Sequence, residues 1–353
     1  MEKRPETALS VSAGAHTDSL LLYCRAGFEA ECAQEIATLA GTGHVDAPAG
    51  AGFVDFTADA SDRRDPPNWR TLIFARQCIP VFAKLTQLPR QDRLTPIMHA
   101  LAQRNETFSD AWVEAPDNDT GKALAPFCKS FGNALIGGLK KARMLDASAP
   151  RRLHAFFPQS DKVYIGAVHP AHAAPWPQGI PRLKFPREAP SRSTLKLDEA
   201  LLVLLDDGER ARWLKPGMSA VDLGAAPGGW TWQLVRRSLR VTAIDNGPMD
   251  PALMASGLVT HLRTDGFRYR PKKPVDWLVC DMVEQPRRVA ELIANWFADR
   301  ACRHAVFNLK LPMKKRFDEA RLCLERVRGA ARDVRARQLY HDREEITVFA
   351  RAG

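Results

Sequence analysis

The sequence lacks the features that mark membrane-bound, secreted and metal-stapled proteins. No stretch reaches the roughly 18 apolar residues that a membrane-spanning helix needs. The opening MEKRPETALSVSAGAHTDS contains no apolar segment of a secretion signal. The seven cysteines are odd in number, scattered and never spaced as C-x-x-C, which argues against a disulfide framework and a zinc knuckle. We therefore expect a soluble, cytoplasmic protein with reduced thiols.

Two further absences narrow the function. No internal repeat of the kind that builds a solenoid is visible. His169 and His172 lack a third ligand in sequence, so no metal site is predicted from them. Nothing in the sequence points to a membrane or to an obligatory protein partner.

What the chain does have is length and positive charge. At 353 residues, it is long enough for two or three domains. Its 51 lysines and arginines outnumber 41 acidic residues, which gives a net charge of +10 and favours a polyanionic partner such as nucleic acid. The basic residues gather in five clusters, at 140–143, 151–152, 182–187, 268–273 and 314–316.

The first 170 residues alternate between expected strands and helices. One helical stripe follows Phe28, Cys32, Ile36 and Leu39, and Thr95 is placed to cap another helix. No glycine-rich phosphate loop occurs here, so we expect small α+β units built for binding. The segment 175–190 carries five prolines and is the predicted domain junction.

Beyond the junction, strand and helix patterns alternate regularly. The segments MSAVDLG, LRVTAIDN, VTHLRTDGF, VDWLVCDM and HAVFNLKLP each read as a strand followed by a turn or an amphipathic stretch. This alternation predicts a parallel sheet with helices on both faces, where ligands bind beyond the carboxyl ends of the strands.

The segment AVDLGAAPGGWTWQL, residues 220–234, predicts a nucleoside-cofactor loop. Gly224, Ala226 and Gly229 occupy the three small positions of a G-x-G-x-x-G pattern directly after a strand. Asp245, at the end of the next strand, is placed to accept hydrogen bonds from ribose hydroxyls. These signals alone do not separate a nicotinamide cofactor from S-adenosylmethionine.

Three details favour S-adenosylmethionine. Asp222 lies inside the first strand, where an acid suits the cationic amino-acid end of that cofactor and would be awkward beside a pyrophosphate. Pro227 removes an N–H that a diphosphate-binding turn would use. Asp265 is expected at the end of the third strand, within reach of an adenine amino group. Each acid taken singly could instead be an ordinary strand-end cap.

The sequence resembles a known family at this loop and at several other segments. VDLGAAPGGWTWQL resembles the cofactor loop of FtsJ-type ribose methyltransferases. Other segments resemble the RlmM family of bacterial 23S ribosomal RNA 2′-O-methyltransferases: WPQGIPRLKFP, SRSTLKLDEA, DNGPM, CDMVE, FNLKLPMKK and ARQLYHDREE. The resemblance implies an α/β fold with a Rossmann-like class I methyltransferase domain at 191–353. A ferredoxin-like unit at 1–60, an RNA-binding THUMP domain at 61–172 and a linker at 173–190 would precede it.

The resemblance also implies the chemistry: 2′-O-methylation of a cytidine in 23S ribosomal RNA or a large-subunit assembly precursor, with S-adenosylmethionine as cofactor. The family's Lys-Asp-Lys-Glu tetrad maps onto Lys196, Asp281, Lys310 and Glu345, although Glu344 is an adjacent alternative for the last acid. Lys310 would be the base, Lys196 would steer the hydroxyl, and the two acids would orient the lysines. The expected cofactor-binding residues are Ser193, Asp222, Gly224, Ala226, Pro227, Gly228, Gly229, Asp245, Asp265 and Asp281.

One property of the tetrad stays open at this stage. Free lysine is mostly protonated at pH 7 and is a poor base. Burial and a second ammonium would lower the pKa of Lys310, whereas Asp281 would raise it, so sequence does not give the sign of the net shift.

Other chemistries fit the sequence less well. A nicotinamide oxidoreductase is disfavoured by Asp222 and Pro227, and a silent RNA-binding methyltransferase fold by the complete tetrad. DPPNW at 65–69 lies far upstream of the cofactor loop, unlike the D-P-P-Y loop of amino-methyltransferases. Ser193-x-x-Lys196 has no S-D-N or K-T-G companion of a serine acyl enzyme. Cys280 is expected to point away from the cofactor, on the opposite side of its strand from Asp281.

Overall fold

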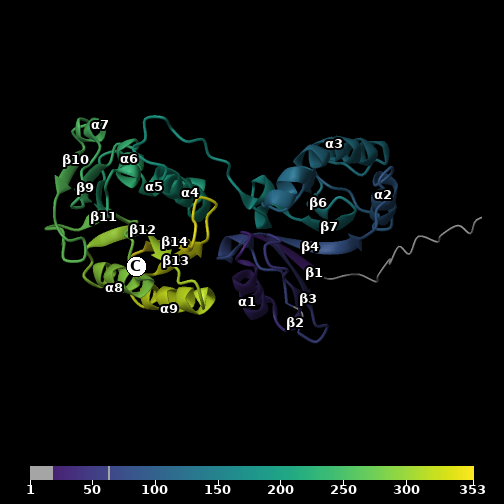
Figure 1. Ribbon diagram of the computed structural model, residues 1–353, viewed down its shortest axis with the longest axis horizontal. Coiled ribbons are helices and arrows are strands. Elements are labelled where there is room, and N and C mark those ends of the chain that lie inside the picture. Colours follow the sequence, from purple (N-terminus) through teal and green to yellow (C-terminus); the bar gives the residue numbers. More distant parts are fainter. Residues whose placement is uncertain (1–18, 63) are drawn as a thin grey trace, which may run out of the picture. The chain divides into compact units, whose positions relative to one another are not determined.

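The computed structural model describes residues 19–62 and 64–353. The chain divides into two units, Met1–Ile180 and Pro181–Gly353, and the division lies within the proline-rich segment 175–190. Each unit is built on its own β-sheet (Figure 1).

The N-terminal unit contains one sheet of seven strands in the order β2-β3-β1-β4-β7-β6-β5. All neighbours are antiparallel except β5 and β6. The strands are β1 Ser19–Cys24, β2 Gly43–Asp46, β3 Phe53–Ala58, β4 Ala75–Leu85, β5 Ala111–Glu114, β6 Arg152–Gln159 and β7 Lys162–Val168. The helices are α1 Glu29–Ala40, α2 Leu94–Ala102 and α3 Asp119–Lys141, with 3-10 turns η1 Trp69–Thr71, η2 Pro170–His172 and η3 Pro177–Gly179.

This sheet crosses the boundary expected near residue 60. Strand β1 pairs with β3 on one side and with β4 on the other, from Ser19 opposite Val81 to Cys24 opposite Ala75. The segments 1–60 and 61–172, expected to form separate units, therefore contribute strands to one hydrogen-bonded sheet. Sequence periodicity identified the strands but carries no information on which distant strands pair.

Helix packing confirms the predicted helices and corrects two details. Phe28, Cys32 and Ile36 are buried as expected, but Leu39 is 41% exposed, and Ala40 continues the buried stripe at four-residue spacing. Thr95 does not cap α2, because the helix already begins at Leu94. The Asp92 side chain instead accepts a hydrogen bond from the Thr95 backbone N–H. In α3, Phe131, Leu135 and Leu139 pack into a core shared with α2 and strands β4 to β7.

The C-terminal unit has a second seven-stranded sheet, in the order β10-β9-β8-β11-β12-β14-β13. Its strands are β8 Ser219–Leu223, β9 Arg240–Ile244, β10 Val259–Leu262, β11 Val275–Cys280, β12 Cys302–Lys310, β13 Asp333–Arg337 and β14 Glu345–Arg351. Its helices are α4 Thr194–Leu204, α5 Asp207–Trp213, α6 Gly229–Val235, α7 Pro251–Met254, α8 Pro286–Ala298 and α9 Arg316–Arg328.

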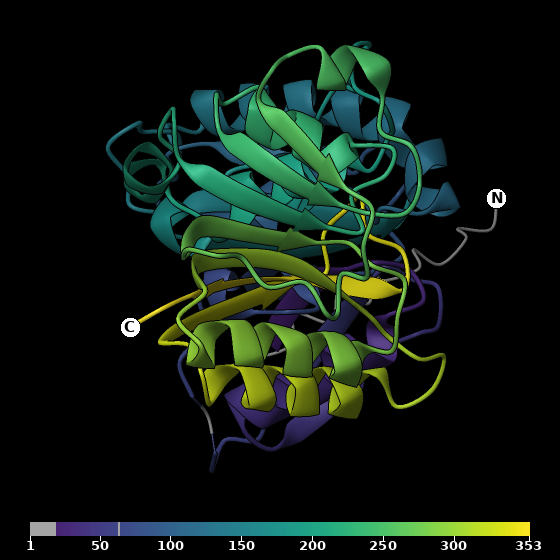
Figure 2. The same cartoon turned by 90° about the vertical axis from the view of Figure 1, so that its left-hand side faces the viewer.

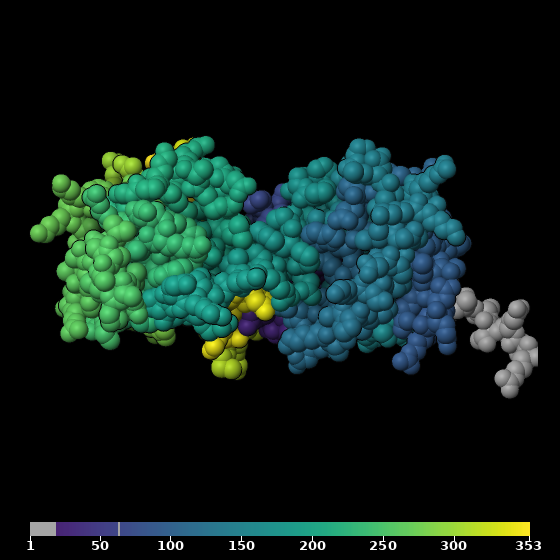
Figure 3. Space-filling view, turned by 90° about the horizontal axis from the view of Figure 1, so that it is seen from above, coloured from purple at the N-terminus to yellow at the C-terminus, as the bar shows by residue number. Residues whose placement is uncertain are grey.

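Helices cover both faces of this sheet. Helices α8 and α9 lie side by side on one face (Figure 2), and α4 and α6 contact each other and the strands on the opposite face. Figure 3 shows the surface of this unit from the side of α6 and α7, in green. The predicted parallel sheet is confirmed for β8 to β12, whereas β14 runs antiparallel to both β12 and β13.

The strand order reverses at β8. From β8 the chain moves outward to β9 and β10, then returns to β11 on the other side of β8. In open sheets of this kind, ligands bind at the carboxyl ends of the strands where the order reverses. The loop after β8 begins at Gly224, so the fold predicts a ligand site at the carboxyl ends of the strands beside this loop.

Candidate active site

Four predicted residues come together at this edge of the second sheet. Lys196 lies in the first turn of α4, Asp281 directly follows β11, Lys310 ends β12 and Glu345 begins β14. The antiparallel register pairs Lys310 with Glu345 across β12 and β14. Because the parallel strands β11 and β12 end at the same edge, Asp281 and Lys310 become neighbours.

The four side chains form a closed set of ion pairs, which we call the tetrad. The Lys310 Nζ donates to Asp281 Oδ1 at 2.6 Å and also to Glu345 Oε2. Lys196 pairs with Glu345 Oε1, and its Nζ lies 3.5 Å from Asp281 Oδ2. Each carboxylate thus bridges both lysines, so the charges balance within the cluster.

The structure gives the sign that the sequence left open for Lys310. Burial lowers the pKa of this ammonium, but the carboxylates of Asp281 and Glu345 outweigh burial and raise the pKa above its ordinary value. Lys310 is therefore protonated in the tetrad as it stands.

The two adjacent glutamates have different environments. Glu345 is 4% exposed and contacts both tetrad lysines. Glu344 has a 63% exposed side chain and pairs with Arg316 at 2.8 Å. The alternation of side chains along β14 sends them to opposite sides.

Sequence reasoning missed Glu199, which supports the tetrad from behind. It lies on α4 one turn beyond Lys196 and is buried. Its carboxylate accepts hydrogen bonds from the backbone N–H of Tyr340 at 2.8 Å and of His341 at 2.9 Å. Glu199 therefore ties the loop before β14 to α4 and fixes Lys196 relative to Glu345. The only sequence signal was an acid at helical spacing from Lys196.

A cleft of about 600 Å³ lies beside the tetrad at the carboxyl ends of β8, β9 and β11. Five predicted residues line it: Gly224, Ala226, Asp245, Asp265 and Asp281. The lining residues that sequence reasoning missed are Ile244, Asn246, Thr264, Gly266, Phe267, Met282, Val283 and Glu284. Most of these lie within the quoted segments DNGPM, TDGF and CDMVE, which could have identified them.

Asp245 organises the loop at one side of the cleft. Its Oδ2 accepts from the Ala226 backbone N–H at 3.0 Å, and its Oδ1 accepts from the Gly247 backbone N–H at 2.7 Å. A carboxylate oxygen can accept a second hydrogen bond, so both oxygens can still receive ribose hydroxyls. Gly224 next to it has φ of +76°, and a Cβ there would lie 2.7 Å from Met282 Cγ. That position requires glycine.

Asp265 lies beyond the strand to which it was assigned. Strand β10 ends at Leu262, and Asp265 follows in an exposed turn, where its side chain accepts from the Phe267 backbone N–H at 2.8 Å. The predicted position at a strand end was therefore wrong by three residues, because the chain turns earlier than the apolar pattern suggested. The residue still lines the cleft.

Asp222 lies behind the cleft wall. It is 1% exposed and does not line the cleft, and its Oδ2 accepts from Thr231 Oγ1 in α6 at 2.6 Å. Among the described residues, Asp222 Oδ1 has no hydrogen-bond partner. Burial, together with the carboxylates of Asp281 and Asp245, raises the pKa of Asp222 to about 7. The geometry makes Asp222 an anchor for the start of α6.

Four other predicted cofactor residues also lie outside the cleft lining: Ser193, Pro227, Gly228 and Gly229. A Cβ on Gly229 would collide with the Ser193 hydroxyl, so this glycine lets α4 and α6 approach closely. Gly228 has φ of +118°, and a Cβ there would lie 2.5 Å from Leu253 Cδ2. The small residues of this loop thus serve helix packing as well as access to the main chain.

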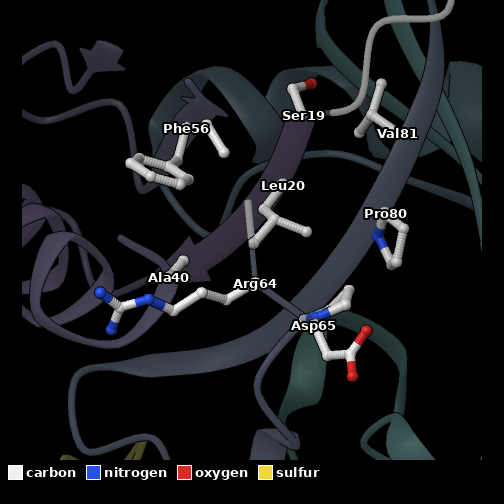
Figure 4. Close-up of a pocket in the computed structure, with 10 residues that line it drawn as sticks. Ser19, Leu20, Ala40, Phe56, Arg64, Asp65, Pro80 and Val81 are labelled. Carbon is white, nitrogen blue, oxygen red and sulfur yellow. The ribbon is translucent and has the colours of Figure 1, made fainter. Parts of the chain in front are cut away.

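The N-terminal unit has a smaller cavity, of about 260 Å³, between β1, β3, β4 and the end of α1 (Figure 4). Arg64 and Asp65 are the charged residues among the described side chains that line it, and Arg64 pairs with Asp62 at 3.3 Å. Leu20, Phe56 and Val81 form much of the remaining wall. Arg64 and Asp65 are the titratable side chains of the lining among the described residues, whereas four carboxylates line the cleft beside the tetrad: Asp245, Asp265, Asp281 and Glu284.

Three further observations bear on other chemistries. Within residues 19–62 and 64–353, no three His, Cys, Asp or Glu side chains are grouped as metal ligands. In the same described part, no helix is both long and apolar enough to cross a bilayer. Cys280 is buried, and burial raises the pKa of its thiol to about 12, so it is not poised as a nucleophile.

Family models match segments of both units of the chain. Residues 17–79 match the RlmM ferredoxin-like domain, residues 92–169 match the N-terminal region of ribosomal RNA large subunit methyltransferase M, and residues 189–328 match the FtsJ-like methyltransferases. Ribosomal RNA large subunit methyltransferase M of Xanthomonas oryzae pv. oryzae (strain PXO99A) is 53% identical over 345 residues, covering 95% of this chain and 99% of that protein. The protein of the same name from Methylococcus capsulatus is 53% identical and covers 94% and 97%.

Solved structures are more distant. TrmN from Thermus thermophilus is 17% identical, with a TM-score of 0.38, and covers 94% of this chain and 99% of that one. The curated relatives are close enough, and cover enough of the chain, to place it. The chain belongs to the RlmM family of ribosomal RNA large subunit methyltransferases.

Proposed function

We propose that this member of the RlmM family transfers a methyl group from S-adenosylmethionine to a ribose 2′-hydroxyl of 23S ribosomal RNA, with a cytidine as target. The observation that carries the proposal is the position of Asp281. This residue lines the cleft and also bridges both lysines of the tetrad. A methyl donor in the cleft and a hydroxyl held by the tetrad would therefore meet at Asp281.

The residues of the cleft suit S-adenosylmethionine. Asp245 would accept the ribose hydroxyls, the backbone beside Gly224 and Ala226 would lie along the cofactor, and Asp265 would meet the adenine amino group. When bound, the cofactor supplies an electrophilic methyl group on a positively charged sulfur. Asp222 would act through α6, since it lies behind the wall, and Ser193, Pro227, Gly228 and Gly229 would shape the loop and the adjoining helix.

The tetrad would position the hydroxyl and take its proton. Lys196 and Lys310 are 18% and 23% exposed at their side chains, so a ribose can reach both. Asp281 and Glu345 hold the two ammonium groups in fixed directions, which supplies the in-line alignment that methyl transfer needs. Lys310 can accept the proton only when it has lost its own. Since its pKa is raised, the base form is scarce at neutral pH, and the rate should increase as the pH rises.

The RNA would approach over the loops that follow the tetrad strands. Lys314 and Lys315 are exposed just beyond β12, where they can contact phosphates. The N-terminal unit would hold a more distant part of the RNA through its ferredoxin-like and THUMP segments, with the proline-rich stretch as linker. Phosphate contacts of this kind make binding weaken as salt rises.

The test uses ribosomal RNA from cells that lack this protein. Purified protein and labelled S-adenosylmethionine should methylate this RNA, and nucleoside mass mapping should place the methyl group on the 2′-oxygen of one 23S cytidine. Methyl transfer to a base, or to small-subunit RNA alone, would overturn the proposal. Binding of the cofactor without transfer to naked RNA or to large-subunit precursors would favour the silent RNA-binding alternative.

A further inference from the structure

A chain of buried polar side chains leads away from the tetrad into the C-terminal unit. Asn308 Nδ2 donates to Asp281 Oδ1 at 2.8 Å, and Asn308 Oδ1 lies 2.7 Å from Thr347 Oγ1. Thr347 Oγ1 lies in turn 3.1 Å and 3.0 Å from the two oxygens of Asp342. Asn308 is on β12, Thr347 on β14 and Asp342 in the loop before β14. We call Asn308, Thr347 and Asp342 the inner chain.

The orientation of the Asn308 amide follows from its neighbours. Asp281 is paired with Lys310 and Lys196 and therefore accepts hydrogen bonds. The amide must turn its NH₂ group toward Asp281, which leaves its oxygen facing Thr347. The reverse orientation would place two oxygens against each other at 2.8 Å.

Counting hydrogens then fixes the state of Asp342. The contact between Thr347 and Asn308 needs a hydrogen, and only the Thr347 hydroxyl can supply it. That hydroxyl has one hydrogen, so the contact between Thr347 and Asp342 needs a hydrogen from Asp342. Asp342 Oδ2 already accepts from the Leu339 backbone N–H at 3.0 Å, which leaves Oδ1 to carry the proton.

The surroundings of Asp342 favour the neutral acid. The residue is 1% exposed, and both Asn308 and Thr347 are fully buried. Burial raises the pKa of Asp342 well above its ordinary value, and the carboxylates of Glu345 on β14 and Glu199 on α4 raise it further. The Leu339 backbone N–H and the Lys196 ammonium act in the opposite direction and are outweighed.

We propose that Asp342 is held as a neutral carboxylic acid and starts a one-directional hydrogen-bond chain through Thr347 and Asn308 that fixes Asp281 against Lys310. Asp342, Thr347 and Asn308 are positioning residues, since they act through Asp281 and touch no substrate. The proposal deepens the proposed function and rests on it for its catalytic readout only. Each donor in such a chain polarises the next, so the last hydrogen bond, onto Asp281, is strengthened.

The proton on Asp342 can be tested without any substrate. Infrared spectra of the full-length wild type and of Asp342→Asn are recorded at pH 7 and subtracted. The difference should contain the C=O stretching band of a hydrogen-bonded carboxylic acid. Bands of a carboxylate alone would overturn the proposal. Asp222→Asn is the matched control, because its buried acid has a pKa of about 7 and its own acid band should fade as the pH rises through that value.

The positioning of Asp281 is tested on Lys310. In full-length protein labelled with ¹³C-lysine, the Lys310 side-chain signal reports its pairing with Asp281. Thr347→Val removes the donor to Asn308 and should move this signal, whereas Thr347→Ser and Asp342→Asn retain a donor and should leave it unchanged. An unchanged signal in Thr347→Val would overturn the positioning role, whether or not methyl transfer has been established.

The catalytic readout is single-turnover methyl transfer. Thr347→Val should lower the rate by about tenfold or more, as loss of an outer hydrogen-bond partner commonly does, with cofactor affinity unchanged. Thr347→Ser and Asp342→Asn should stay within about threefold of wild type, because the chain of donors is intact. Equal losses in Asp342→Asn and Thr347→Val would contradict the inference. Absence of transfer in the wild type would instead overturn the proposed function, and the infrared and ¹³C results would still decide this one.

Discussion

Each unit of the protein contains a hydrogen-bonded cluster of charged side chains, and the two clusters differ in access. In the N-terminal unit, Glu114 accepts from Tyr23 Oη at 3.0 Å and contacts His154 Nδ1 at 2.8 Å. Arg152 Nε donates to His154 Nε2 at 3.2 Å, so His154 carries its hydrogen on Nδ1 and donates it to Glu114. We call these four residues the sealed cluster. The side chains of Glu114 and His154 are only 2% and 1% exposed.

The tetrad uses the same kinds of group but is open at one side. Asp281, Lys196 and Lys310 keep 16%, 18% and 23% of their side-chain surface, and Asp281 lines a cleft. The remaining hydrogen-bonding groups of the sealed cluster contact nearby backbone atoms. The Gln178 backbone N–H donates to Glu114 at 2.6 Å, and Arg152 donates to the Ala174 carbonyl oxygen at 3.2 Å. Buried charge alone therefore does not identify a candidate active site. Access from a cleft distinguishes the two clusters.

The largest effect on activity is expected from removing Lys310, the ammonium group that contacts both carboxylates of the tetrad. Lys310→Ala should lower single-turnover methyl transfer by about 10²–10⁴-fold, the range of a lost acid–base group, with cofactor affinity within a few-fold of wild type. Lys215→Ala, at an exposed lysine that precedes β8, is the control for loss of a lysine and should retain the chemical step. Turnover at the wild-type rate in Lys310→Ala would remove the functional contrast between the two clusters.

The second prediction concerns the sealed cluster. Glu114→Ala should lower the free energy of unfolding by roughly 3–5 kcal/mol, since it leaves buried polar partners without an acceptor, and should leave cofactor binding unchanged. Urea unfolding and calorimetric cofactor titration measure the two quantities. A loss of cofactor binding in a folded Glu114→Ala protein would show that this cluster is more than structural.

The stability that Glu114 gives to the fold should also depend on pH. Burial would raise the pKa of Glu114, but the hydrogen bonds from His154, Gln178 and Tyr23 outweigh burial and lower the pKa below its ordinary value. A lowered carboxyl pKa stabilises the fold above the ordinary glutamate value, and the stabilisation is lost as the pH falls toward the folded value. Wild type should therefore lose stability below about pH 4.5, whereas Glu114→Gln should lose less over that interval. Equal slopes would contradict the assignment.

The two clusters also show what sequence can and cannot predict. The tetrad could be predicted because its members lie in segments that resemble the RlmM family: Lys196 in STLKLDEA at the start of a helix, and the other three beside strand ends, as with Lys310 in FNLKLP. The sealed cluster could not, because Tyr23, Glu114 and His154 come from β1, β5 and β6, and periodicity does not give the order of strands in a sheet. For the same reason the continuous N-terminal sheet was not foreseen. The exposure of Leu39 and the hydrogen bond from the Thr95 backbone N–H to Asp92 depend on tertiary packing and local turn geometry that propensity does not specify.

Within the cleft, the acids were identified but their contacts were not. Asp222 was expected beside the cofactor, and the structure places it behind the wall against Thr231. Strand alternation makes both sides of β8 available to an acid, and the pattern VDLG does not say which side α6 will cover.

A smaller effect is expected from Asp245, which lines the cleft beside the tetrad. Asp245→Ala should weaken S-adenosylmethionine binding by about 1.5–3 kcal/mol, because the ribose hydroxyls lose a charged acceptor. It should also loosen the loop at Ala226 and Gly247, whose N–H groups Asp245 accepts. Asp245→Asn keeps an acceptor and should lose less affinity. Unchanged calorimetric affinity in Asp245→Ala would place the cofactor elsewhere.

The smallest effect is expected from two exposed apolar side chains that follow the tetrad strands β11 and β12. Among the described large hydrophobic side chains, Val283 and Met313 are 91% and 93% exposed, and the next most exposed, Leu322, is 42% exposed. Val283 follows Asp281 by two residues and Met313 follows Lys310 by three, so both leave the carboxyl ends of neighbouring parallel strands. Among the described residues, none of the large hydrophobic side chains exposed to this degree lies on β1, β5 or β6, the strands that carry the sealed cluster.

Val283 and Met313 are almost fully exposed, and Met313 directly precedes the exposed Lys314 and Lys315. Apolar and positively charged side chains together suit an RNA nucleotide, whose base offers an apolar face and whose phosphate carries charge. Met313→Ala should weaken RNA binding by about 1 kcal/mol, as expected for partial burial of one side chain, and should leave cofactor affinity and the tetrad chemistry unchanged. Met313→Leu should restore most of the affinity, and Leu322→Ala on α9 is the control for a general loss of apolar surface. Because the lost contact is apolar, the deficit of Met313→Ala should stay constant as salt rises, whereas that of Lys314→Ala should shrink. If the loss of RNA affinity in Met313→Ala disappeared at high salt, the effect would belong to the neighbouring lysines. The tetrad and the sealed cluster would then differ in access from a cleft, and not in an apolar contact with RNA.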